Sequence, residues 1–250
     1  MNDAERASRR GSLDQASIAA DACRKCAIGY ERRNNVYGEG DPCARLMVVG
    51  EGPGETEDEL GRPFVGRAGQ LLDRMLAAIE LAREEVYICN TVKCRPTVPG
   101  PNGPRNRAPD QQEMDNCRAF LNEQIAIVAP EIILALGAPA AKSFLGKDFQ
   151  ITRMRGRWYI GPQEIPLMVT FHPAYILRQT GGEIEAVKRL VWADLKAVRA
   201  KLDAPPPLAV RPSPSRNAKR ASSKVPAREP RTAGRVAARR RRARRIRRCR

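Results

Sequence analysis

Short apolar runs alternate with segments of helical spacing over most of the chain. Apolar residues at helical spacing predict helices over residues 71–79, 114–125, 138–145 and 184–202. Continuous apolar runs predict strands over residues 46–49, 86–89, 132–136 and 166–171. Strands of this kind, alternating with helices, predict an α/β fold with a mainly parallel, buried central sheet.

Polar or glycine residues directly follow each of the four predicted strands. Gly50 and Glu51 follow the first, Asn90 the second, Gly137 the third, and His172 the fourth. In open α/β sheets ligands bind outside the carboxyl ends of the strands. We therefore expect four separate segments to deliver candidate site residues to one edge of the sheet.

Charge divides the chain into a nearly neutral body and a basic end. Of the net charge of +17, residues 205–250 supply 17 basic side chains and one acid, so the first 204 residues are close to neutral. The composition predicts that residues 205–250 form a disordered Arg-rich tail that binds nucleic acid nonspecifically. We expect residues 1–20 to be a loose polar leader and residues 21–204 to form one domain.

The remaining composition bears on compartment and cofactor. The chain is 42% hydrophobic and has no apolar run long enough for a membrane span and no signal sequence, so we expect a cytoplasmic protein without membrane contact. Its seven cysteines are an odd number. In a reducing compartment such a set favours metal or cluster ligation, or buried thiols, over disulfides.

The cysteine spacing suggests a cluster that joins distant segments. Cys23 and Cys26 form a C-x-x-C pair, and Cys94 and Cys117 are the natural second pair. Their wide separation is typical of an iron–sulfur cluster rather than a compact zinc ribbon, although a redox-active C-x-x-C stays open. Of the other cysteines, Cys89 falls inside an apolar strand and is expected in the core, Cys43 lies in a polar loop without an obvious role, and Cys249 is in the tail.

The segment from Gly50 to Gly54 (GEGPG) has the form of a phosphate-binding glycine loop, but the acidic residues around it argue against phosphate binding. Acidic side chains in and after the loop would repel a polyphosphate, and a tight turn before a solvated acidic helix is the plain alternative. His172 is the only histidine. An imidazole between Phe171 and Pro173, at the end of an apolar strand, suits proton transfer or stabilisation of an anion, with a structural role as the alternative.

Several motifs together resemble the family 4, iron–sulfur type of uracil-DNA glycosylase. They are GEGPGETED from Gly50, GRPFVGRAGQLL from Gly61, VYICNTVKCRP from Val86, NRAP from Asn106, LGAPAA from Leu136, ITRMRGRW from Ile151 and FHPAYILR from Phe171. Their common order makes the resemblance specific, and it spans residues 23–202. It implies a three-layer α/β sandwich of the uracil-DNA glycosylase type.

The resemblance also implies roles for individual residues. Cys23, Cys26, Cys94 and Cys117 match the ligands of a 4Fe-4S cluster. Glu51 and Gly52 match the first uracil-site loop, with Glu57 as a second candidate for the catalytic acid. Phe64 matches the ring that stacks on the flipped base, although a core aromatic is the alternative. Asn90 matches the amide that reads the uracil edge, and His172 the histidine near uracil O2.

Three further features complete the expectations. Tyr175, Ile176, Leu177 and Arg178 combine apolar bulk with a cation, as a DNA wedge would, although the start of a core helix explains them equally. Residues 97–105 make a longer loop than the resemblance leads us to expect. A related enzyme links covalently to its product through a histidine near the GRPF motif. In this chain the residues around that motif include no histidine, so we do not expect a covalent link.

These features predict a monomeric base-excision repair enzyme. It would flip uracil out of single-stranded or duplex DNA and release it by hydrolysis, leaving an abasic site. Two alternatives remain at this point. One is a noncatalytic DNA-binding protein with a structural iron–sulfur cluster, and the other is a redox protein that uses the C-x-x-C pair.

Overall fold

A computed structural model describes residues 2–101 and 103–204. The predicted tail over residues 205–250 lies outside the described residues. The helices are α1 (Asp3–Asp21), α2 (Ala27–Glu31), α3 (Glu55–Leu60), α4 (Arg67–Ala77), α5 (Gln111–Val128), α6 (Gly137–Leu145), α7 (Ile151–Met154), α8 (Pro173–Leu177) and α9 (Gly182–Asp203), with short 3₁₀ turns at Arg83–Glu85 and Pro162–Glu164. The strands are β1 (Gly38–Gly40), β2 (Leu46–Gly50), β3 (Tyr87–Asn90), β4 (Thr97–Val98), β5 (Arg105–Asn106), β6 (Ile132–Leu136), β7 (Trp158–Ile160) and β8 (Pro166–Thr170).

The central sheet has the strand order β1-β3-β2-β6-β8-β7. Its four inner strands are parallel, and the two edge strands run antiparallel to their neighbours. All four strands predicted from apolar runs are therefore inner strands, within one residue of their predicted ends. The α/β class and the mainly parallel sheet are confirmed.

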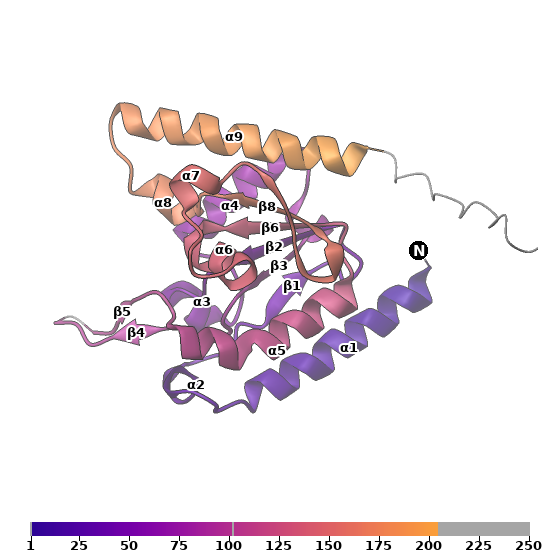
Figure 1. The fold of residues 1–250 in the computed structure, drawn as a ribbon. Coiled ribbons are helices and arrows are strands. Elements are labelled where there is room, and N and C mark those ends of the chain that lie inside the picture. The colour runs from indigo at the N-terminus through magenta and orange to yellow at the C-terminus, as the bar shows by residue number, and fades with distance from the viewer. Residues whose placement is uncertain (1, 102, 205–250) are drawn as a thin grey trace, which may run out of the picture. The chain divides into compact units, whose positions relative to one another are not determined.

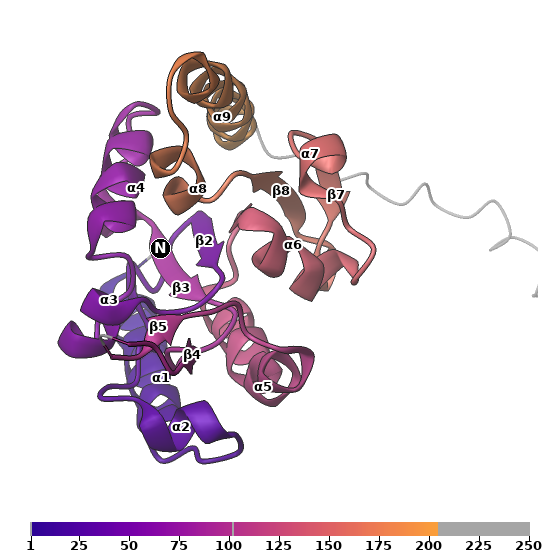
Figure 2. The same cartoon turned by 90° about the vertical axis from the view of Figure 1, so that its left-hand side faces the viewer.

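Alternate residues of the inner strands face two separate cores. Met47 and Val49 of β2 lie in the core that α1, α5 and α6 cover, whereas Leu46 and Val48 lie in the core that α4, α8 and α9 cover. Figures 1 and 2 show these two helical layers on opposite sides of the sheet. This is the three-layer sandwich, with the parallel strands buried on both faces.

The prediction of a loose leader over residues 1–20 is wrong. The segment forms α1, whose N-cap Asn2 accepts a hydrogen bond from the Glu5 amide at 2.8 Å. Leu13, Ala16 and Ala20 are 1–4% exposed and pack against the core beside α5. A stripe of one leucine and two alanines is too weakly hydrophobic to be recognised as a helix face in the sequence. Its small side chains nevertheless allow α1 to pack closely against α5.

The longer loop over residues 97–105 contributes to the β4–β5 hairpin. Thr97 pairs with Asn106 and Val98 with Arg105, and the hairpin projects away from the sheet (Figure 1). Its base is held by Arg95, whose guanidinium donates to Asn106 Oδ1 at 2.6 Å and to the Pro104 carbonyl at 3.2 Å. The hairpin is thus anchored to the segment that follows β3.

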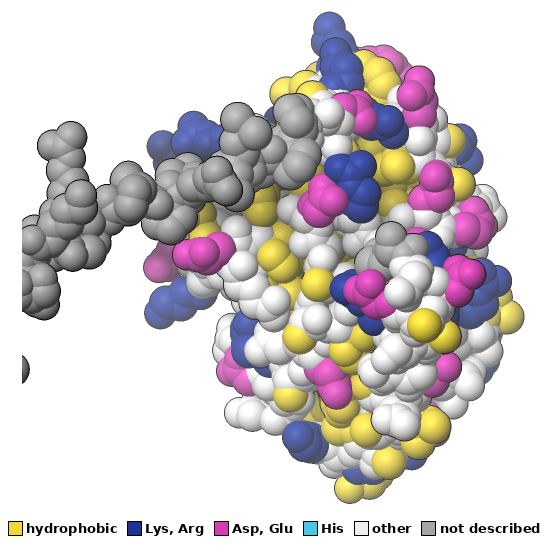
Figure 3. All heavy atoms as spheres, turned by 90° about the vertical axis from the view of Figure 1, so that its right-hand side faces the viewer, with side chains coloured by type: hydrophobic (Ala, Val, Ile, Leu, Met, Phe, Trp, Pro, Cys, Tyr) yellow, Lys and Arg dark blue, Asp and Glu magenta, His cyan; other side chains and the backbone are white. Residues whose placement is uncertain are grey.

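The surface mixes the two signs of charge. Lys and Arg side chains alternate with Asp and Glu over the face that Figure 3 shows, with hydrophobic side chains between them. This mixture agrees with the near-neutral net charge of the first 204 residues. Among the described helices, none combines the length and the apolar character needed to cross a bilayer.

Candidate active site

A cavity of about 670 Å³ opens at the carboxyl ends of the inner strands. It is lined by residues that follow three of those strands, among them Glu51 after β2, Asn90 at the end of β3 and His172 after β8. Gly137, the first residue of α6 after β6, lies behind the histidine, because a Cβ built on it would come within 3.1 Å of His172 Cβ. The predicted convergence at one sheet edge therefore holds.

Phe64 forms a wall of the cavity beside the histidine. Its ring is 5% exposed and stacks on His172, with ring centroids 5.5 Å apart and an interplanar angle of 29°. The backbone of Phe64 has a φ of 52°, a left-handed conformation that costs free energy in a bulky residue. Arg83 stabilises this turn by donating from its guanidinium to the carbonyls of Phe64 and Pro63.

Gly50 keeps the floor of the cavity open. A Cβ on this residue would lie 2.4 Å from Phe64 Cζ and 2.4 Å from Asn90 Oδ1. Both distances are far inside van der Waals contact, so any side chain here would displace the ring or the amide. Thr91 fixes the Gly50 backbone, since its amide and hydroxyl both donate to the Gly50 carbonyl, at 2.9 and 3.0 Å.

Asn90 carries an unpaired polar atom in the cavity wall. The residue is 1% exposed, and its Oδ1 has no hydrogen-bond partner within the described chain. A buried acceptor without a donor costs about 1–3 kcal/mol, and such a cost is retained where a ligand supplies the missing donor. The geometry therefore points to a ligand N–H opposite Asn90.

His172 is held as a neutral ring with a defined tautomer. Its Nδ1 accepts a hydrogen bond from the Ala174 amide at 3.1 Å, which leaves the proton on Nε2. Burial, together with the positive charge of Arg178, lowers the pKa of His172 from its ordinary value to about 4. At neutral pH the ring can thus offer an Nε2–H to a ligand atom in the cavity.

The two candidate acids lie in different environments. Glu51 lines the cavity, and burial raises the pKa of its carboxyl while the Arg178 charge opposes that rise. Glu57 is also at the cavity, but Oε1 accepts from the amides of Val65 and Gly66 at 2.9 and 2.7 Å, and Oε2 accepts from the Gly54 amide at 3.1 Å. Glu57 thereby ties the loop before α3 to the Phe64 turn.

The four wedge candidates do not share one position. Leu177, 37% exposed, and Arg178 line the cavity mouth. Ile176 is 2% exposed in the core beneath α8, and Tyr175 stacks on Phe171 with centroids 4.8 Å apart. A wedge that includes Ile176 is contradicted in this structure, because α8 turns that side chain into the core, whereas Tyr175 is half-buried and Leu177 and Arg178 line the cavity.

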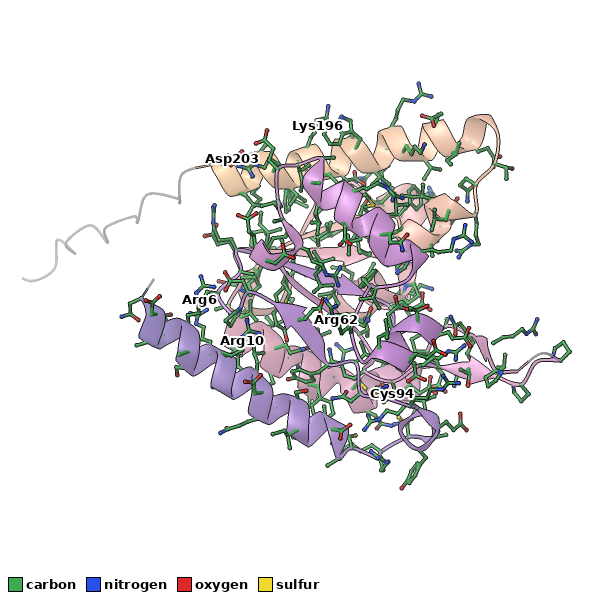
Figure 4. All side chains as sticks on the ribbon, turned by 180° about the vertical axis from the view of Figure 1, so that it is seen from behind. Arg6, Arg10, Arg62, Cys94, Lys196 and Asp203 are labelled. Atoms are coloured by element: carbon green, nitrogen blue, oxygen red, sulfur yellow. The ribbon has the colours of Figure 1, made fainter. Side chains whose placement is uncertain are left out.

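The four cysteines predicted as ligands gather at the end of α1, α2, the segment after β3 and α5. Burial raises the pKa of Cys94 to about 11 and also raises that of Cys26 and Cys117, and each of these thiols is affected by the charge of another of the four. Arg32 Nη1 donates to Cys94 Sγ at 3.1 Å. Figure 4 shows Cys94 next to α2.

The four thiols are the kind of ligand that iron–sulfur clusters use. Within the described parts of the chain, no group of three or more His, Cys, Asp or Glu side chains is arranged to hold a metal ion. A four-iron cluster takes one thiolate on each iron, so its four sulfurs surround a cube. Four thiols with N–H donors nearby match that chemistry, and coordination would offset the cost of burying thiolates.

The sequence and fold agree with one protein family. The sequence profile of the uracil DNA glycosylase superfamily matches residues 37–196. The chain belongs to this superfamily. The match covers β1 through most of α9, and thus every wall of the cavity.

Individual relatives narrow the similarity further. A type-4 uracil-DNA glycosylase of Thermotoga maritima is 43% identical over 196 residues, which are 77% of this chain and 95% of that protein. A type-4 enzyme of Sulfurisphaera tokodaii is 40% identical over 196 residues, 75% and 84% of the two chains. A type-5 uracil-DNA glycosylase of Pyrobaculum aerophilum is 34% identical over 121 residues, only 42% of this chain. The similarity to type-4 members is therefore the more extensive, as the motifs predict.

Proposed function

We propose that this protein removes uracil from DNA by hydrolysing the bond between the base and deoxyribose. The observation that carries the proposal is the unpaired Oδ1 of the buried Asn90. Uracil offers an N–H donor at N3 beside an acceptor at O4, which is the complement of a carboxamide. Cytosine inverts part of this pattern, so it would leave buried polar groups of Asn90 unpaired, a defect that can lower reactivity by orders of magnitude.

We infer roles for the remaining cavity residues, and their geometry supports these roles. Phe64 would stack on the flipped base and offset part of the unstacking cost. Departure of the base leaves negative charge on uracil, and the Nε2–H of neutral His172 would donate to O2 as that charge develops. This donor is preorganised, because the bond from the Ala174 amide fixes the ring.

The deoxyribose becomes cationic in the same step, and a water molecule must then attack its anomeric carbon. Glu51 is the better candidate for orienting that water, because it lines the cavity and its side chain makes no hydrogen bond within the described residues. Burial also raises the pKa of its carboxyl, which makes the carboxylate a stronger base. Glu57 already accepts three backbone hydrogen bonds. We assign Glu57 to positioning the Phe64 turn.

We further propose that Cys23, Cys26, Cys94 and Cys117 hold a 4Fe-4S cluster. Such a cluster would crosslink the end of α1 to the segment after β3 and to α5, and it would supply stability rather than a step of the reaction. Arg32 would donate to the Cys94 sulfur. The support is the cysteine chemistry described above.

Leu177 and Arg178 line the cavity, and so does Asn106 at the base of the β4–β5 hairpin. DNA would reach the cavity between these two segments. The substrate would be uracil in single-stranded or duplex DNA, and the protein would act as a monomer. The basic residues 205–250 would add nonspecific affinity for phosphates.

The deciding experiment is a uracil-release assay on single-stranded and U·G duplex oligonucleotides without added metal or nucleotide. The native protein should leave alkali-sensitive abasic sites at uracil, and Asn90→Ala and His172→Ala should lose most of this activity while still unfolding cooperatively. Asn35→Ala, which truncates a half-buried asparagine outside the cavity, is the matched control. Full activity of both cavity variants would refute the assignment.

A further inference from the structure

A fully buried lysine lies between the cysteines and the candidate base-reading amide. Lys93 is 1% exposed, three residues after Asn90 and directly before Cys94. Its Nζ donates to the Asn90 carbonyl at 2.7 Å and to Gln124 Oε1 at 2.5 Å, and it faces the Tyr37 ring 5.5 Å from the centroid. No part of the mechanism above uses this side chain.

The lysine is costly, and its surroundings compensate only in part. An ammonium taken out of water without an acidic partner loses several kcal/mol of hydration free energy. The groups that face it are a carbonyl, a side-chain amide, an aromatic ring and the neighbouring thiols. A methionine would fill the same space without that cost, whereas the lysine brings a donor to the Asn90 carbonyl and a positive charge beside the thiols of Cys94 and Cys117.

The main chain of Lys93 is bound to the cysteine region. Its amide donates to the sulfur of Cys117, and its carbonyl accepts from the Val36 amide at 2.9 Å. One residue therefore contacts a candidate cluster ligand through its backbone and Asn90 through its side chain.

Gln124 fixes the direction of this linkage. Its Nε2 donates to the Tyr37 carbonyl at 2.9 Å and to the Tyr87 hydroxyl at 3.0 Å. With both amide hydrogens used, Oε1 has to point at the ammonium. The network from α5 through Gln124 and Lys93 to Asn90 is thus oriented without ambiguity.

We propose that Lys93 is a positioning residue that fixes the Asn90 backbone for reading uracil and couples that position to the cysteine site. This inference rests on the proposed function. The Asn90 backbone is paired with β2 on one side, and its carbonyl accepts a side-chain bond from Lys93. Its Oδ1 has no partner within the described residues, so the bond from Lys93 adds a fixed contact to the sheet ladder at this residue. A shift of about 1 Å in such a group can cost about 10²-fold in rate.

The test compares Lys93→Met, Gln124→Leu and the double variant. Gln124→Leu removes one partner of the ammonium but keeps the bond to Asn90, so we expect lower stability with unchanged base discrimination. The double variant also removes the Gln124 acceptor that Lys93→Met leaves without a donor, while the Tyr37 carbonyl and the Tyr87 hydroxyl lose their donor as they do in Gln124→Leu. We therefore expect it to lose less stability than the two single variants lose together.

Base discrimination is read by binding rather than by turnover. The probe is a duplex with 2′-fluorinated deoxyuridine, which resists cleavage, compared with the same duplex carrying deoxycytidine. We expect Lys93→Met and the double variant to lose at least about tenfold of the native preference, equivalent to about 1.4 kcal/mol. Iron content, the visible absorbance band and thermal unfolding are measured on the same samples.

Two outcomes would overturn the inference. One is native discrimination by the double variant. The other is a loss of binding that is proportional to the loss of iron, because the molecules that still hold iron would then bind the uracil analogue as the native protein does. If the native protein itself shows no preference for the uracil analogue and releases no uracil, the proposed function fails instead, and the two failures are thereby distinguished.

Discussion

The imidazole of His172 lies against the ring of Phe64, with centroids 5.5 Å apart and planes inclined by 29°. The two rings come from separate segments of the chain, His172 from the residue after β8 and Phe64 from the turn before α4. Each limits the movement of the other, so a change in either should affect both base stacking and proton donation.

Phe64→Leu should therefore impair catalysis more than it impairs folding. Leucine keeps most of the buried apolar volume but removes the aromatic face, and base–aromatic stacking is worth about 1–3 kcal/mol. We expect kcat/KM for uracil release to fall by about 10–100-fold. Phe149→Leu, at a ring that is 3% exposed in the other core, is the matched control and should keep native kcat/KM.

Asn90→Asp should change base selectivity. A carboxyl group can accept from the exocyclic amine of cytosine, whereas it loses the donor that uracil O4 needs. We expect the ratio of uracil to cytosine release, measured in single-turnover assays, to fall by at least about 100-fold. Asn35→Asp introduces an acid at an amide oxygen that is also buried but lies outside the cavity, and it should leave that ratio unchanged. An unaltered ratio in Asn90→Asp would mean that the base is read elsewhere.

His172 should make stability depend on pH in mild acid. Its pKa is about 4 when folded and about 6.5 when unfolded, so between these values the unfolded chain binds a proton that the folded chain excludes. The free energy of unfolding should then decrease as pH falls from 6.5 towards 4, by up to about 3 kcal/mol from this residue.

The measurement is urea unfolding at pH 7.5 and pH 5 of the native protein and of His172→Asn. The variant lacks the titrating ring, so its difference between the two pH values should be smaller. An equal difference in both proteins would contradict a depressed histidine pKa. Nitrogen chemical shifts of the ring should also report the neutral Nε2–H tautomer at pH 6.

The proposed cysteine ligands predict which substitutions remove the visible absorbance of the protein. Protein purified without oxygen should be brown, with iron and sulfide in equal amounts, as expected of thiolate-ligated clusters. Cys23→Ser and Cys117→Ser should lose the visible band and much of the thermal stability. Cys43→Ser and Cys89→Ser alter buried thiols that are not among the four proposed ligands, so both variants should keep the visible band. Colourless native protein with stoichiometric zinc would refute the cluster.

Removing residues 205–250 should weaken DNA binding without affecting chemistry. The body of the protein is nearly neutral, whereas this segment carries a net charge of +16. Deletion should flatten the slope of log affinity against log salt for duplex DNA, and single-turnover cleavage at saturating protein should stay native. Identical salt slopes would show that the segment is not a DNA-binding arm.

The inner strands could be predicted because burial on both faces gives continuous apolar runs. The edge strands β1 and β7 could not be predicted in this way. Strand β1 is Gly-Glu-Gly and has no apolar signature. Strand β7 is Trp-Tyr-Ile, which is apolar but only three residues long, too short to be recognised as a strand from its pattern. Helix α1 was missed for a related reason, since its contact stripe is mostly alanine.

The site divides similarly between what patterns reveal and what only tertiary contacts reveal. His172 and Asn90 could be predicted as cavity residues because they stand at the carboxyl ends of apolar strands, where ligands bind in open α/β sheets, and because the motifs carry a resemblance. Lys93 gave no signal, since a lysine in a polar loop normally lies in solvent. The role of Glu57 as a brace depends on three backbone amides that no side-chain pattern records.

The arrangement of the cysteines along the chain has a consequence for biosynthesis. All four lie within the first 117 residues, on or beside α1, α2, β3 and α5, whereas β8 and His172 are synthesised later. A growing chain folds from its N-terminal end, so the thiols are available on the ribosome before the second half of the sheet exists. The proposed cluster could then load before the cavity is complete, and a chain that lacks iron at that stage would form the rest of the sheet without this crosslink.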